Sequence, residues 1–142
     1  HDATASLGFE FICKEERLIY MTDTGYVSSK NANYMLDADY YIIESNHDVE
    51  MLMNTNRPMS LKNRILSDRG HLSNLDSALL MSRLIGEKTK EIVLAHLSRE
   101  ANTKELALGT YQEVFSQQGV CCEKLQIKVA SQVDIVIGGK DK

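Results

Sequence analysis

The sequence predicts an α/β domain in which a mixed sheet is flanked by helices. Short apolar segments of strand length alternate along the chain with segments of helical periodicity, which is the pattern of layered α/β folds. The first two strand segments are separated only by a charged turn at residues 14–17, so they form a hairpin and make the sheet mixed. Asp23, Glu44 and His96 each stand at the end of a strand segment, where ligand chemistry gathers in such sheets.

After this hairpin, predicted helices and strands follow one another. Phe9, Phe11 and Cys13 alternate on one face of the first strand. The predicted strands lie at 7–13, 18–21, 39–45, 90–98, 124–131 and 133–139. The predicted helices lie at 28–38, 58–66, 73–86 and 102–119, with an irregular or weakly helical stretch at 47–60. Pro58 begins its helix and Gly119 ends the last one, as the residue preferences of helix termini predict.

Polar residues in front of the predicted helices can accept hydrogen bonds from the first turn. The candidates are Ser73 or Asn74 for the helix at 73–86, and Ser98 and Asn102 for the helix at 102–119. Two interpretations of His47 and Asp48 stay open. Asp48 can cap a turn, or the two residues can line an active-site cleft.

Length and composition describe one soluble globular domain. The 142 residues are 43% hydrophobic and 25% charged, and no apolar run reaches the roughly 18 residues of a membrane span. The net charge of −4 excludes a generally basic surface that coats nucleic acid, but it is compatible with a local phosphate site that contains metal ions. The three cysteines fit neither a disulfide framework nor a zinc motif, so we expect small apolar packing residues in a cytoplasmic protein.

Histidines and one aspartate are the candidate ligands for a metal ion. Taken singly, each histidine has the ordinary interpretation of a surface or core residue, and Asp23 that of a turn residue. In context, LAHLSREANT carries His96 from a strand onto a polar loop, and TDTG does the same with Asp23. A hydrolytic metal site requires such a mixture of nitrogen and oxygen donors on stiff elements. The four histidines are His1, His47, His71 and His96.

Five short motifs carry a family resemblance. HDATASLGFEF, TDTG, ESNHD, GHLSN and LAHLS, in this order, resemble the C-terminal half of a metallo-β-lactamase-fold hydrolase. The likeness is greatest to the bacterial YycJ/WalJ type, whose relatives include ribonuclease Z, and it runs from residue 1 to about residue 120. It implies that residues 1–142 form half of an αβ/βα sandwich and that the N-terminal half is absent from this chain.

The resemblance also implies roles for five residues around two divalent metal ions, zinc or manganese. His1 matches a ligand of the first metal, His96 a ligand of the second, and Asp23 the aspartate that bridges both. His71 matches a histidine that acts near the scissile phosphate, and Glu44 matches its glutamate partner. The implied reaction is hydrolysis of phosphodiester bonds by metal-bound hydroxide in a nuclease. The YycJ type implies an exonuclease on DNA and ribonuclease Z implies RNA, so the choice between the two nucleic acids and the direction of cleavage stay open.

The chain departs from this family in one respect, because the superfamily motif H-x-H-x-D-H does not occur in it. With three of the expected ligands, the chain alone is expected to bind metal poorly and to hydrolyse little, and to need the missing N-terminal half as its partner. Two other functions stay open: a thioester or lactone hydrolase of the same fold, and a non-catalytic fragment or binding module. No membrane contact is expected, and the oligomeric state stays open.

A basic stretch lies between two of the motifs. Its residues are Arg57, Lys62, Arg64 and Arg69. A solvated helix face is the ordinary interpretation, and contact with the phosphates of a nucleic acid is the functional one. Arg64 and Arg69 of this stretch, together with Ser98 after His96, are the predicted substrate-binding residues.

Overall fold

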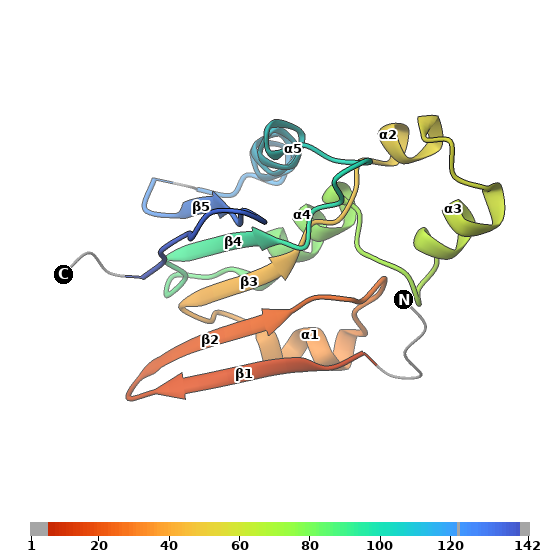
Figure 1. Ribbon diagram of the computed structural model, residues 1–142. Coiled ribbons are helices and arrows are strands. Elements are labelled where there is room, and N and C mark those ends of the chain that lie inside the picture. Colours follow the sequence, from red (N-terminus) through yellow and green to blue (C-terminus); the bar gives the residue numbers. More distant parts are fainter. Residues whose placement is uncertain (1–5, 122, 140–142) are drawn as a thin grey trace.

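The computed structural model describes residues 6–121 and 123–139, and within these ranges it contains one five-stranded sheet (Figure 1). The strands are β1 (Gly8–Cys13), β2 (Glu16–Met21), β3 (Tyr40–Glu44), β4 (Glu91–Ala95) and β5 (Gln126–Val129). They lie in the order β1-β2-β3-β4-β5, with β1 antiparallel to β2 and the other neighbours parallel. The predicted α/β class and the opening hairpin are both confirmed.

The five described helices are α1 (Ser29–Met35), α2 (Val49–Asn54), α3 (Met59–Ile65), α4 (Asn74–Leu84) and α5 (Lys104–Gln117). Four of them begin after a polar residue whose side chain accepts a backbone N–H of the first turn, whereas α3 begins after Pro58 without such a cap. Ser73 caps α4 as predicted, and Asp48 caps α2, a short helix within the stretch expected to be irregular or weakly helical. The expected caps of α5 are wrong, because Thr103 accepts the backbone N–H of Leu106 instead.

One face of the sheet packs against helices. Side chains alternate along each strand, so every second residue points to the helices. Ile43, Ile92 and Leu94 on this face are fully buried, together with Met81 of α4 and Tyr111 of α5. The core therefore lies between the sheet and helices α1, α4 and α5, and it fixes the carboxyl ends of β2, β3 and β4 at one edge.

The other face of the sheet is apolar and largely open. Phe9 and Tyr20 are cross-strand neighbours on it, and Ile42 pairs with both Tyr20 and Val93 in adjacent strands. Phe9 is 52% exposed and Phe11 is 54% exposed. No helix of the described part covers this face, and none of these helices is long and apolar enough to cross a membrane.

Two expectations for the strands and cysteines are wrong. Residues 133–139 form no strand, and Ile135 is 92% exposed. The chain turns at Ser131, whose hydroxyl accepts the backbone N–H of Asp134, and it leaves the edge of the sheet. Apolar alternation cannot reveal such a turn, because it reports the local pattern and not the availability of a pairing edge. Cys13 and Cys121 are exposed and are not packing residues, and Cys122 lies outside the described residues.

Close packing at Gly25 joins two loops that lead to the functional edge. A Cβ atom at Gly25 would overlap the Ser67 carbonyl oxygen, whereas one at Gly109 in α5 would meet nothing within 4 Å. Gly25→Ala should therefore lower the free energy of unfolding by about 1–3 kcal/mol. Gly109→Ala, the matched control, should raise it by about 0.5–1 kcal/mol, because alanine favours helix. Urea titration measures both, and equal effects would contradict the assigned loop contact.

Candidate metal centre

Four side chains meet at the carboxyl edge of the parallel strands. Asp23 follows β2, Glu44 ends β3, His96 follows β4, and His71 lies in the loop before α4. One ligand atom from each residue lies within 4.8 Å of the others. The structure thus brings together three predicted side chains from strand ends and the predicted His71, although their sequence motifs are far apart.

Glu44 is the centre of this cluster. Its side chain is fully buried, and Oε1 accepts hydrogen bonds from Nδ1 of His71 at 2.8 Å and from Nδ1 of His96 at 2.6 Å. Oε2 accepts the backbone N–H groups of Thr24 and Leu72, both at 3.2 Å. The sequence predicted Glu44 as the partner of His71, and the structure adds His96. With Nδ1–H of each ring donated to Glu44, the lone pair of each neutral ring lies on Nε2, as in metal-binding histidines.

The buried carboxylate keeps its charge because of these donors. Burial raises the pKa of Glu44, but hydrogen bonds from His71, His96 and Leu72, with the charge that His71 carries when it is protonated, outweigh it and lower the pKa to about 2. The pKa of His96 is raised, chiefly by its hydrogen bond to Glu44, against the opposing effect of burial. Asp23 adds negative charge, with Oδ1 at 3.6 Å from Nδ1 of His96. The site is an electronegative pocket that favours cations.

Two of the four residues have a left-handed backbone. The φ angle is 60° at Asp23 and 57° at His96, a region that costs free energy for residues other than glycine. Ser6 donates its hydroxyl to the Asp23 carbonyl oxygen at 2.8 Å, and Asn46 donates its amide to the His96 carbonyl oxygen at 2.8 Å. Neighbouring side chains therefore hold both conformations in place, as happens at functional sites.

A buried asparagine network behind the cluster was missed by sequence reasoning. The side-chain amides of Asn74 and Asn102 bond to each other, and Asn102 also donates to the carbonyl oxygens of Ser45 and Asn46. These bonds tie the loop after β3 to the starts of α4 and α5. The signal was present in the sequence as SN at 45–46, SN at 73–74 and AN at 101–102, three small-residue–asparagine pairs beside apolar segments.

The remaining predicted site residues lie around this edge. Ser98 follows His96 in the same loop, where its hydroxyl accepts the backbone N–H of Ala101. Arg64 lies on α3 and Arg69 in the loop before His71, both exposed. His1 lies outside the described residues, so its predicted role as a metal ligand stays a prediction.

Structural partners account for two members of the basic stretch. Arg57 pairs with Glu100 at 2.9 Å, and the ammonium group of Lys62 donates to the Met53 carbonyl oxygen at 2.6 Å. The expectation of a uniformly solvated face is therefore wrong for the buried Lys62. His47 is 1% exposed and forms a β-bridge with Ser73, the residue before α4. It is therefore buried and does not line an open cleft.

The donor set of the cluster fits a divalent cation. The imidazoles are oriented by a carboxylate, which is the usual outer-shell partner of metal-binding histidines. Asp23 contributes a carboxylate whose side chain is 45% exposed, so its oxygens are accessible from outside the fold. Mixed nitrogen and oxygen donors of this kind suit zinc and manganese.

The pKa of Glu44 predicts how stability depends on pH. Its folded pKa of about 2 lies below the ordinary value of 4.5, which corresponds to roughly 3 kcal/mol of stabilisation by the ionised form. This contribution is present above pH 4.5 and is lost as the pH falls from 4.5 towards 2. The difference in unfolding free energy between wild type and Glu44→Gln should therefore shrink across that window in metal-free buffer. A difference that stays constant down to pH 2 would contradict the assigned ionisation.

The fold of the described residues matches part of a metallo-β-lactamase-fold protein. The metallo-β-lactamase fold protein YhfI from Bacillus subtilis superposes with a TM-score of 0.57 at 15% sequence identity, covering 87% of this chain and 40% of that chain. This likeness shows the fold alone. No model of a known protein family matches the chain.

Proteins related to this chain in sequence form a narrower group than the structures that share its fold. The exodeoxyribonuclease WalJ of Streptococcus pneumoniae serotype 2 (strain D39 / NCTC 7466) is 50% identical over 117 residues, or 82% of this chain and 44% of that protein. The exodeoxyribonuclease YycJ of Bacillus anthracis is 44% identical over 119 residues, or 84% of this chain and 45% of that protein. The chain is therefore a homologue of the WalJ and YycJ proteins and spans a little under half of their length.

Proposed function

We propose that this chain is the C-terminal half of a metallo-β-lactamase-fold domain, and that the complete domain hydrolyses phosphodiester bonds in DNA as an exonuclease. The observation that carries the proposal is the shared carboxylate of Glu44, which orients His71 and His96 beside Asp23. The names of the relatives, both exodeoxyribonucleases, support the substrate class. The N-terminal half would supply the ligands that this chain lacks.

The proposed roles follow from the contacts of each residue. Asp23 and His96 would hold two divalent cations together with ligands of the N-terminal half. Such cations polarise phosphate oxygens and lower the pKa of a coordinated water. Glu44 positions both imidazoles and is not itself a ligand, because all its hydrogen-bonding capacity is directed to donors within the fold. His71 would hold or donate a proton at the scissile phosphate.

The test compares substrates and metals in the complete protein. Digestion of a DNA strand labelled at each end, with zinc or manganese added after chelation, should show metal-dependent release of nucleotides from one end. A thioester and a lactone serve as controls for the other hydrolases of this fold. Turnover of the thioester without DNA cleavage would overturn the proposal, and so would the absence of both metal binding and cleavage, which would indicate a non-catalytic module.

The open face of the sheet is where the N-terminal half would pack. Two sheets of a sandwich bury their facing apolar side chains against each other. Ile42 lies at the centre of this face, between Tyr20 and Val93. Ile42→Ser should therefore lower the unfolding free energy of the complete protein by about 2–4 kcal/mol, and that of this chain alone by less than half as much. Chemical denaturation of both forms measures this, and equal losses would place the interface elsewhere.

A further inference from the structure

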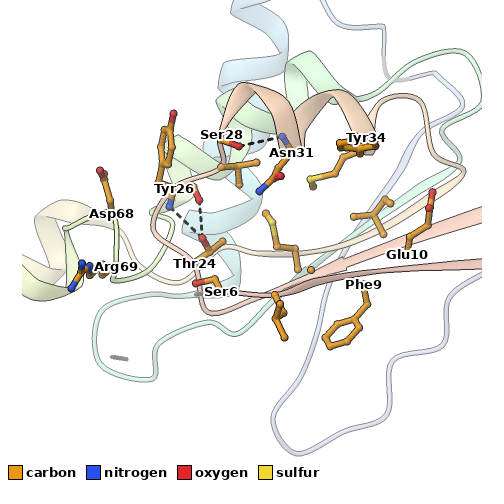
Figure 2. Close-up of a pocket in the computed structure, with 16 residues that line it drawn as sticks. Ser6, Phe9, Glu10, Thr24, Tyr26, Ser28, Asn31, Tyr34, Asp68 and Arg69 are labelled. Atoms are coloured by element: carbon orange, nitrogen blue, oxygen red, sulfur yellow. Dashed lines mark hydrogen bonds between the residues drawn. The ribbon is translucent and has the colours of Figure 1, made fainter. Parts of the chain in front are cut away.

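A cavity lies beside the metal-ligand cluster, between the β1–β2 hairpin and α1 (Figure 2). Its volume is about 530 Å³, within the range of roughly 300–1,000 Å³ that small-molecule sites have. The interior is largely apolar, whereas polar and aromatic side chains lie around it. The apolar lining includes Ile19, Met21, Val27 and Met35.

The cavity is connected to the cluster through the backbone. Thr24, which lines it, directly follows Asp23 and donates its backbone N–H to Glu44. Arg69, at the same end of the cavity, lies two residues before His71. Tight packing of Gly25 on the Ser67–Asp68 backbone holds these two walls together. None of the four cluster side chains lines the cavity, so a ligand in it would reach the cluster past Thr24 and Arg69.

Polar groups around the apolar interior are arranged to contact a ligand. Figure 2 shows the side-chain amide of Asn31, an exposed residue of α1, turned into the cavity, where it is available to a ligand. Tyr26 and Tyr34 lie at the rim and are 58% and 70% exposed. At the end of the cavity away from Arg69, Arg17 connects β1 to α1. It pairs with Glu10 at 2.7 Å and donates to the Tyr34 carbonyl oxygen at 2.7 Å.

We propose that this cavity binds the base and sugar of the nucleotide next to the scissile phosphate, an inference that rests on the proposed function in DNA hydrolysis. The faces of a base are apolar and stack on aromatic rings, which suits the interior and the two tyrosines. The edge of a base carries donors and acceptors that an asparagine amide can match. A preceding apolar segment of the same chain would leave the Asn31 amide buried without a partner, which costs free energy.

The test uses the complete protein and three variants. Asn31→Ala removes the amide. Gly8→Leu fills the cavity, because a Cβ atom at Gly8 lies in ordinary contact with Met21 and leaves room for a longer side chain. Asn33→Ala is the matched control, since Asn33 is an exposed asparagine of the same helix that does not line the cavity. Binding of each deoxynucleoside 5′-monophosphate is measured by NMR titration with zinc present, because the metal-free cluster is electronegative and would repel the phosphate. Hydrolysis of DNA is measured separately.

The two readouts separate this inference from the proposed function. Asn31→Ala and Gly8→Leu should each weaken monophosphate binding about tenfold and raise KM for DNA, with little change in Asn33→Ala. Wild-type hydrolysis with binding and KM unaffected by both variants would overturn the inference and leave the proposed function intact. Absence of monophosphate binding by the wild type, as when the protein's own chain fills the cavity, would also overturn it. Binding without any DNA hydrolysis would support the cavity as a nucleotide site and overturn the proposed function.

Discussion

Asp23→Ala is expected to abolish phosphodiester hydrolysis by the complete protein and to remove one equivalent of bound metal. Asp23 has the exposed carboxylate of the cluster, whereas both oxygens of Glu44 already accept hydrogen bonds within the fold. Glu44 therefore cannot replace it. Loss of an outer-shell partner alone costs roughly 10–100-fold in affinity or activity, so loss of a ligand should exceed about 100-fold.

A second substitution separates the chemistry from the backbone. Alanine at φ 60° adds conformational strain, whereas asparagine tolerates this region, so Asp23→Asn removes the charge and preserves the turn. Asp37 offers a matched control, because its φ is 48° and it lies away from the cluster, where its carboxylate accepts the backbone N–H of Lys88. Asp37→Asn should retain activity. Metal analysis and nuclease assays check these results, and full turnover by Asp23→Asn with both metals bound would contradict the bridging role.

Glu44→Gln is expected to weaken both metal binding and the fold. The amide has the shape of the carboxylate but only one acceptor oxygen. If that oxygen faces His71 and His96, the new NH₂ group points at the N–H groups of Thr24 and Leu72, where donor meets donor. We expect the free energy of unfolding to fall by about 2–3 kcal/mol at pH 7 and metal affinity to fall about 10–100-fold.

The control for this variant is Glu50→Gln. Glu50 lies in the first turn of α2 and is exposed, so its loss should change stability by no more than about 0.5 kcal/mol. Urea denaturation in chelator gives the stability, and competition with a chromophoric chelator gives the affinity. If Glu44→Gln bound metal as tightly as wild type, the orientation of the imidazoles by Glu44 would not contribute to metal affinity.

Much of the fold could be predicted because the strands differ locally from the helices. Apolar runs ending at Glu44 and His96 indicated parallel strands whose polar ends meet at one edge, and the structure places both residues there. The segment at 133–139 could not be predicted in the same way. Its apolar alternation matches a strand, but Ser131 turns the chain, and Lys128 holds the Ile137 carbonyl oxygen instead.

The residues of the candidate site could be predicted from the sequence, but the hydrogen bonds between them could not. Family motifs identified Asp23, Glu44, His71 and His96, but periodicity says nothing about contacts between residues that are distant in sequence. Glu44 binds His71 and His96 at separations of 27 and 52 positions. The support given by Asn46 to the His96 backbone spans 50 positions and depends on the packing of two loops. Such long-range hydrogen bonds follow from the folded arrangement and have no local signature.

The left-handed backbone at Asp23 and His96 has an evolutionary consequence. Glycine would relieve the strain at either position, by about 1 kcal/mol or more, but it would leave no side chain to bind a metal. If the proposed catalytic function were lost, substitution of either residue by glycine would remove this strain and stabilise the fold. Among proteins that align with this chain, we therefore expect aspartate and histidine at these two turns where the proposed hydrolysis is retained, and glycine where it has been lost.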